Sequence, residues 1–166
     1  MASPASTPQT ADLTEPELQA WRGMLRVHAA LTKALDAQLE AEHGLPLSSY
    51  EVLLFLADAP GQKMRMSELA ESILLSRSGL TRLVDRLERD GLIARQTCAQ
   101  DARGSYAKLT PAGARKLTDA RVTHLAGVRA LFLDHLGPDE QELLGELWAR
   151  VLPGAHRGGA RCAPEA

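Results

Sequence analysis

Arginines and small hydroxyl side chains gather in one short stretch of the chain, SRSGLTRLVDRLER, at residues 76–89. On a helix, steps of three and four residues separate a polar face from an apolar face. The apolar face would carry Leu80, Leu83, Val84 and Leu87, and the polar face Ser78, Arg82, Asp85 and Arg89, with Arg77, Thr81 and Arg86 at its sides. Arginine can donate two hydrogen bonds to guanine, while serine and threonine can reach phosphates or bases. The pattern is typical of a helix in the major groove of DNA; a solvated surface helix is the alternative interpretation of this stretch taken alone.

A polar loop at about residues 97–104 follows, and in it Asp101 stands two residues before Arg103. Short segments on either side of this loop, LIARQ and SYAKL, have the composition of strands. We therefore expect a β-hairpin with Asp101 and Arg103 at its tip. A hairpin directly after a helix of the kind described above is a winged helix-turn-helix arrangement.

The remaining elements must hold these two segments in place. Hydrophobic periodicity predicts helices at about 14–43, 48–57, a short one from Ser67, 76–90, 110–135 and 139–152. The expected N-caps are Ser48 or Ser49, Ser67, Ser76 and Thr110. The segments at both ends of the chain should be frayed. The expected fold class is mainly α, with six helices and a two-stranded β-wing.

Composition bounds the class of protein. The chain has 166 residues, of which 45% are apolar, and this suits one globular domain. No apolar run could span a bilayer and no signal peptide is recognisable, so we expect a cytoplasmic location without membrane contact. The histidines lack metal-ligand spacing, and no Gly-rich phosphate loop or catalytic triad pattern occurs. We expect no enzyme activity, no metal and no cofactor.

Charge is distributed unevenly along the chain. Residues 63–108 carry nine basic and six acidic side chains, whereas residues 1–62 carry three basic and eight acidic ones. A polyanion site within the internal segment would produce this distribution, and so would ordinary surface variation.

The motifs in this internal segment resemble those of the MarR family of bacterial transcription regulators. The resemblance covers about residues 18–152. It is most specific in MSELAESILLSRSGLTRLVDRLERDGLIAR followed by DARGSYAKLT, with Gly91-Leu92-Ile93, Arg95, Asp101, Arg103 and Leu109-Thr110 at the places of the family pattern. The resemblance implies a sequence-specific DNA-binding regulator that reads a pseudo-palindromic site in double-stranded DNA. We expect a repressor, with an activator as the alternative, because the outcome depends on where the site lies relative to the promoter.

A triangular homodimer is also implied by the resemblance. Dimerisation helices would occupy residues 14–47 and 110–152, around a winged helix-turn-helix domain at 48–109, with disordered ends at 1–13 and 153–166. Apolar residues that suit the interface are Leu18, Trp21, Leu25, Leu131, Phe132, Leu136, Leu143, Leu144, Leu147, Trp148 and Val151. Each of these taken singly also fits an ordinary intrachain core.

The DNA contacts implied by the resemblance are those of Ser76, Arg77, Ser78, Thr81, Arg82, Arg86 and Arg103. Arg103 would enter the minor groove, where narrow A·T-rich stretches attract arginine. Asp101 would support the wing by holding the Arg103 guanidinium at a fixed angle. Arg86 could instead pair with an acid of its own domain. Lys63, Arg65 and Lys108 could touch phosphates or could be solvated.

Regulation is the least specified property. Many relatives are released from DNA by a small aromatic or phenolic ligand, for which the candidate residues here are Trp21, Arg22, Arg26, His28 and Tyr50. A core histidine is the alternative for His28, and ion pairs are the alternative for the two arginines. Other functions to distinguish are a winged-helix protein-interaction module and a redox-responsive regulator acting through Cys98, for which an inert loop cysteine is the simpler interpretation.

Overall fold

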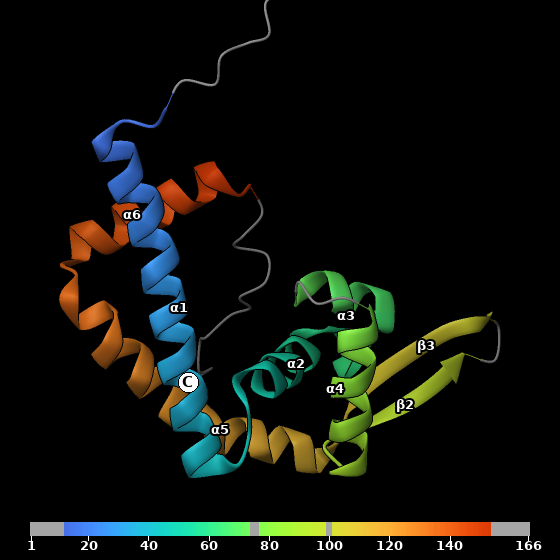
Figure 1. The fold of residues 1–166 in the computed structure, drawn as a ribbon. Coiled ribbons are helices and arrows are strands. Elements are labelled where there is room, and N and C mark those ends of the chain that lie inside the picture. The colour runs from blue at the N-terminus through green and yellow to red at the C-terminus, as the bar shows by residue number, and fades with distance from the viewer. Residues whose placement is uncertain (1–11, 74–76, 99–100, 154–166) are drawn as a thin grey trace, which may run out of the picture.

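The computed structural model describes residues 12–73, 77–98 and 101–153 of the 166-residue chain. Within these residues the chain forms six α-helices, two short 3-10 helices and a three-stranded sheet (Figure 1). The order is α1 (Glu15–His43), α2 (Leu47–Asp58), η1 (Pro60–Gln62), β1 (Lys63–Arg65), α3 (Met66–Ser72), α4 (Arg77–Arg89), β2 (Ile93–Cys98), β3 (Asp101–Leu109), α5 (Pro111–Leu131), η2 (Leu133–His135) and α6 (Pro138–Val151). The predicted fold class is confirmed, with one additional strand.

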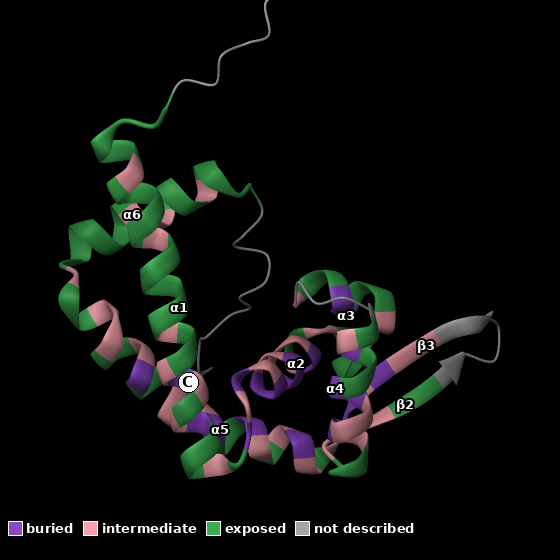
Figure 2. Ribbon diagram, in the orientation of Figure 1, coloured by how far each residue is buried: buried purple, intermediate pink, exposed green. Residues whose placement is uncertain are grey.

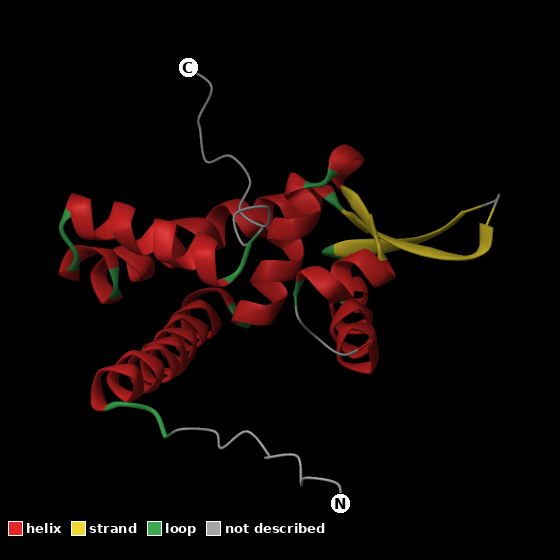
Figure 3. Cartoon of the chain, turned by 90° about the horizontal axis from the view of Figure 1, so that it is seen from above, coloured by secondary structure: helices red, strands yellow, loops and turns green. Residues whose placement is uncertain are grey.

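Two long helices, α1 and α5, connect the two ends of the molecule. The Glu17 carboxylate accepts hydrogen bonds from the Thr14 N–H at 2.7 Å and from its hydroxyl at 2.8 Å, which caps the start of α1. Gly44 ends that helix in the left-handed region at φ 57°. The helices α1 and α5 pack against each other near the C-terminal end of α1, whereas α6 and the N-terminal half of α1 lie apart when seen from above (Figure 3).

The second half of the molecule is built from α2, α3, α4 and the sheet. The strand order is β1-β3-β2, and both pairs are antiparallel. Strand β1 was not predicted from the sequence. It pairs Lys63 with Lys108 and Arg65 with Tyr106. The two wing strands project away from the helices (Figure 1).

The hydrophobic core lies where α2, α4 and the base of the sheet meet (Figure 2). Its fully buried side chains include Leu39, Val52, Leu53, Leu56, Leu69, Leu80, Val84, Leu87 and Ile93. This core supports α4 along its entire apolar face. In contrast, α6 buries no residue within the chain.

Several predicted boundaries and caps are wrong. Helix α2 begins at Leu47, so Ser49 lies inside it and is buried at 1% exposure instead of capping its N-terminus. Helix α3 begins at Met66 with Arg65 as its cap residue, because the chain leaves β1 directly into the helix; Ser67 is already helical. The predicted cap Ser76 lies outside the described residues.

The bounds of the hairpin loop and of the helix that follows it also differ from the prediction. The wing strands reach Cys98 and Asp101, so the connection between them is shorter than the loop predicted at 97–104. Helix α5 ends at Leu131, and η2 covers the segment to His135. The predicted cap Thr110 is confirmed, since its hydroxyl accepts a hydrogen bond from the Gly113 N–H at 3.0 Å.

Candidate nucleic-acid interface

Helix α4 presents a polar face to solvent and anchors the opposite face in the core. Leu80, Leu83, Val84 and Leu87 are at most 7% exposed. Ser78, Thr81 and Arg82 are exposed on the other side of the helix, near its N-terminal end. The two faces predicted from the sequence are therefore confirmed. An exposed arginine beside two hydroxyl groups can donate to, and accept from, the edges of bases or the phosphates.

Arg86 is directed differently from Arg82. It lies half-buried at the side of α4, and its Nη2 donates a hydrogen bond of 2.8 Å to the Ser49 hydroxyl on α2. The acceptor is among the most deeply buried polar groups of the described core. Arg86 thus joins α4 to α2, and its partner is a hydroxyl rather than the acid that the sequence suggested as an alternative.

A cluster of charges holds strand β2 against α4. The Arg95 guanidinium lies 2.5 Å from the Asp85 carboxylate and 3.7 Å from that of Glu88. The backbone N–H of Arg95 also donates to Glu88 at 3.0 Å. The positioning role of Arg95 was missed by sequence reasoning, although Asp85 and Glu88 are one turn apart on the helix that precedes the strand. The spacing of these two acids on one helix face could have indicated a binding site for a basic side chain.

The turn between α4 and β2 is fastened to the start of α5. The Thr110 hydroxyl donates to the carbonyl groups of Gly91 and Leu92, at 2.7 and 3.0 Å. Gly91 has φ 71°, a left-handed conformation that glycine adopts without strain. Gly113 packs so closely on this turn that a methyl group there would overlap the Leu92 carbonyl oxygen. The base of the wing is therefore rigidly joined to α5.

The outer face of the sheet is basic. Lys63 and Arg65 lie opposite Lys108 and Tyr106 across the β1–β3 pair. The Arg65 guanidinium lies 5.2 Å from the centroid of the Tyr106 ring, and the Lys63 ammonium group lies 5.8 Å from it. These are cation–π distances. Tyr106 was not singled out from the sequence, because its cationic neighbours come from a strand about forty residues earlier.

The described residues do not include every predicted side chain of the α4 start and the wing. Ser76 lies outside the described residues, and so do the side chains of Arg77, Cys98, Asp101 and Arg103. The backbone of the last three belongs to the wing strands β2 and β3.

The residues predicted for a small ligand do not form one cluster. Trp21, Arg22, Arg26 and His28 are exposed on α1. Tyr50 is instead 2% exposed, and its ring packs against His124 with 4.5 Å between the ring centroids. The core-histidine alternative for His28 is wrong, because the half of α1 that carries it extends beyond the core.

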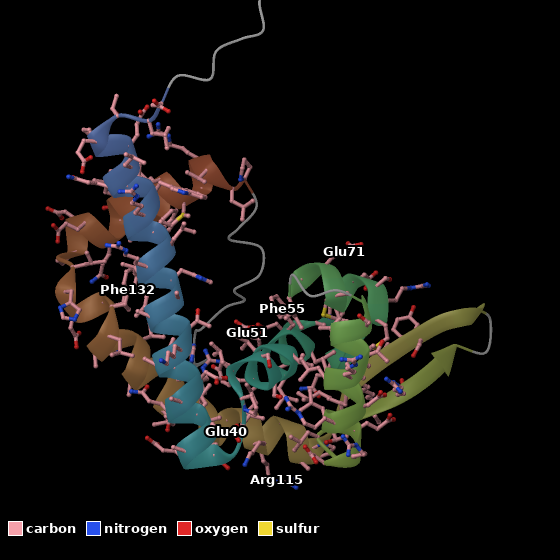
Figure 4. All side chains as sticks on the ribbon, in the orientation of Figure 1. Glu40, Glu51, Phe55, Glu71, Arg115 and Phe132 are labelled. Carbon is pink, nitrogen blue, oxygen red and sulfur yellow. The ribbon has the colours of Figure 1, made fainter. Side chains whose placement is uncertain are left out.

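Two half-buried ionisable groups lie near this part of the core. Burial lowers the pKa of His124, and the charge of Arg121 lowers it further. Burial raises the pKa of the Glu51 carboxyl, and this rise is opposed by the charge of His28. In Figure 4 Glu51 projects from α2 on the side of α1. In both groups burial therefore shifts the protonation equilibrium towards the neutral form, relative to the same group in water.

Within the described ranges, no group of three or more His, Cys, Asp or Glu residues is arranged to hold a metal ion. In the same part of the chain, no helix has the length and apolar character needed to cross a membrane.

Comparisons with known proteins agree on one family. The sequence model of the MarR family matches residues 43–104. Among solved structures, Sco3205 of Streptomyces coelicolor, a MarR family transcriptional regulator in complex with DNA, is 35% identical with a TM-score of 0.81, over 87% of this chain and 91% of that one. AbsC, a MarR family regulator of the same organism, is 35% identical with a TM-score of 0.80, over 90% and 100% of the two chains. The HTH-type transcriptional repressor YetL of Bacillus subtilis is 27% identical, over 67% of this chain and 68% of its own length.

Proposed function

Because this chain belongs to the MarR family of transcription regulators, we propose that it binds a pseudo-palindromic operator in double-stranded DNA as a homodimer and represses transcription from it. The observation that carries this proposal is the exposed polar face of α4, which the core and two side-chain ties hold in a fixed orientation. Each α4 of a two-fold dimer would read one half-site in the major groove. The solved complex of the relative Sco3205 with DNA supports this assignment.

Arg82 is the residue proposed to read a base edge, with Ser78 and Thr81 contacting bases or phosphates beside it. These three side chains share the exposed face near the start of α4. Arg77 begins α4, where the helix dipole favours a phosphate, and Ser76 directly precedes it in the sequence. Arg86 is better suited to holding α4 on α2 than to contacting DNA, since its guanidinium already donates to Ser49.

The wing is proposed to contact the minor groove through Arg103, with Asp101 orienting the guanidinium. Support comes from the backbone, because both residues belong to the projecting strand β3. The base of this strand is fixed to α4 through Arg95 and to α5 through Thr110. A fixed base reduces the conformational freedom that the wing loses when it enters a groove.

The dimer is proposed to form through α1, α5 and α6, with residues 14–47 and 110–152 on either side of the winged domain at 48–109. Helix α6 buries no residue in the isolated chain, and Figure 2 colours it exposed or half-buried throughout. The exposed apolar side chains of this end are Leu13, Trp21, Leu25, Leu143, Leu147, Trp148, Val151 and Leu152. An exposed cluster of large apolar side chains is typical of a protein–protein contact, and a partner chain would cover it.

Release by a small aromatic ligand is proposed to involve the exposed face of α1. Arg22 and Arg26 are one turn apart and exposed, which suits bidentate binding of a carboxylate. Trp21 and His28 lie on the same helix. Tyr50 lies too deep to touch a ligand without movement of α2, since it is 2% exposed.

The proposal that the protein represses transcription is supported by its similarity to the transcriptional repressor YetL.

The experiment that tests the proposal is DNA binding across a salt series. Fragments from upstream of the protein's own gene are compared with a scrambled fragment of the same length by fluorescence anisotropy. We expect operator binding on the order of 10 nM that weakens steeply as salt rises. Equal, weak binding to every fragment would exclude a specific regulator and would favour a winged-helix protein-interaction module.

The role of Arg82 is tested by Arg82→Ala, with Arg115→Ala as the matched control. Loss of a bidentate base contact costs about 1–3 kcal/mol and relaxes the preference at one base pair of each half-site. Arg115 is an exposed arginine of α5 (Figure 4), so its loss removes the same charge at a distance from the exposed face of α4. A uniform loss on all fragments would assign Arg82 to a phosphate instead of a base.

A further inference from the structure

A cavity of about 360 Å³ lies at the corner of the molecule where α1 ends, away from the exposed α1 residues proposed to bind an aromatic ligand. It forms where the end of α1, the start of α2, the end of α4 and the first turns of α5 meet. Its volume is at the small end of the range for small-molecule sites. The apolar part of its lining consists of Leu45, Leu87 and Leu92.

Four charged side chains line this cavity, two of each sign. Arg86 and Lys116 contribute the positive charges, and Glu40 and Asp90 contribute the negative ones. Figure 4 places Glu40 at the junction of α1 with α2. Glu40, Arg86 and Lys116 come from three different helices and Asp90 directly follows α4, so the charges converge only in the folded chain.

These charges do not neutralise one another directly. Asp90 follows Arg86 by one helical turn, a spacing that permits an ion pair. The Arg86 guanidinium instead donates to Ser49, which holds it at the cavity wall. Within the described part of the chain, neither Glu40 nor Asp90 forms an ion pair with Arg86 or Lys116. Both signs of charge are therefore presented to whatever enters the cavity.

From this arrangement we propose that the corner cavity binds a small zwitterion of the amino-acid class, with its carboxylate towards Arg86 and Lys116 and its ammonium group towards Glu40 and Asp90. A simple anion would face the two carboxylates, and a simple cation would face the guanidinium and the ammonium group. A molecule that carries both charges satisfies both pairs, and its connecting chain can lie against the leucine walls. The site is separate from the proposed DNA contacts, and the proposal goes beyond the proposed function.

The test is isothermal titration calorimetry of the full chain without DNA, so its outcome is independent of operator binding. The probes are glycine, 4-aminobutanoate and 6-aminohexanoate, which differ in the separation of the two charges. Hexanoate and hexylamine, which carry one charge each, are the comparison compounds. We expect one of the three zwitterions to bind with one site per chain, about ten-fold more tightly than either singly charged compound.

The variants Lys116→Gln and Asp90→Asn assign the binding to this cavity. Each removes one charge from an exposed or half-buried position, so the fold is retained. We expect each to weaken binding of the preferred zwitterion by about ten-fold. Arg115→Gln is the matched control, because it removes a positive charge from the residue next to Lys116 without changing the cavity lining, and it should leave the affinity unchanged.

Three results would overturn the proposal. The first is the absence of saturable binding by all three zwitterions up to about 20 mM. The second is hexanoate or hexylamine binding as tightly as the best zwitterion, which would show that one charge sign suffices. The third is an equal loss in Arg115→Gln and Lys116→Gln, which would show that binding reports overall charge and not this cavity.

Discussion

Replacing Asp85 with asparagine separates two roles that an acid on a DNA-binding helix could have. Asp85 lies on α4, where its negative charge should repel phosphates. It also holds Arg95 of strand β2 at 2.5 Å, and so positions the wing relative to the helix. If repulsion dominates, Asp85→Asn tightens binding to every DNA. If positioning dominates, it weakens binding to the operator.

The structure sets the size of both effects. The Arg95 and Asp85 side chains are 33% and 46% exposed, so the pair is a surface ion pair worth about 0.2–1 kcal/mol. Its loss should lower the melting temperature by no more than about 4 °C. Glu88 keeps its hydrogen bond to the Arg95 N–H, so the strand stays attached to α4. A wing contact that is lost or misplaced should weaken operator binding by about 1 kcal/mol, or about five-fold.

The assay is fluorescence anisotropy with an operator fragment and a scrambled fragment of equal length, at one salt concentration. We expect Asp85→Asn to weaken operator binding about five-fold and to leave binding to the scrambled fragment unchanged or slightly tighter. Asp90→Asn is the control, since it removes the same charge from the end of α4 without touching β2. The double variant Asp85→Asn/Arg95→Gln should lose little more operator affinity than Arg95→Gln alone, because both changes break one pair.

Tighter operator binding by Asp85→Asn would refute the positioning role. Equal effects of Asp85→Asn and Asp90→Asn would also refute it, since only total charge would then matter. Fully additive losses in the double variant would show that Asp85 and Arg95 act separately.

Three further outcomes follow from the packing. Gly113→Ala should destabilise the chain by more than about 2 kcal/mol in urea unfolding, because the overlap with the Leu92 carbonyl outweighs the roughly 1 kcal/mol gained from helix propensity; an unchanged midpoint would contradict the close packing of α5 on the turn. Burial depresses the pKa of His124, so its neutral form stabilises the fold above the unfolded-state pKa near 6.5, and this contribution is lost as pH falls through that value towards the lower folded pKa; urea unfolding at pH 7.5 and 5.5 should show a smaller loss in His124→Phe than in the wild type, and an equal loss would assign the pH dependence elsewhere. Trp148→Asp should give a folded monomer in analytical ultracentrifugation, because α6 buries no residue within the chain; a persistent dimer would remove this tryptophan from the interface.

The sequence was sufficient where local periodicity determines the structure. The leucines of α4 recur at steps of three and four, and burial on one face follows from that spacing alone. The position of Thr110 before a proline likewise predicted the start of α5, since Pro111 is suited to the first helical turn. The polar and apolar faces of α4 and the start of α5 were therefore predictable before any tertiary contact was known.

Contacts between distant segments determine what was missed. Strand β1 has three residues and pairs with a strand more than forty residues later, so no local pattern marks it. Ser49 has the residue type of a helix cap, yet it accepts a hydrogen bond from Arg86, thirty-seven residues away. Tyr50 resembles a ligand-binding residue by type, but it lies in the core with its ring against His124 of α5. In each case a partner from another element determined the role of the side chain.

Because α5 is attached to the base of the wing, a rotation of this helix at its other end would move the wing. Its twenty-one residues span about 31 Å at a rise of about 1.5 Å per residue. Thr110 and Gly113 fix one end to the turn before β2, while the other end leads into α6, where the partner chain is proposed to pack. A change of about 5° in the crossing angle at the dimer end would displace the wing base by about 3 Å over that length, close to the rise of about 3.4 Å per base pair along one strand. The angle at which two copies cross would thus select the operator spacing that both α4 helices can reach together.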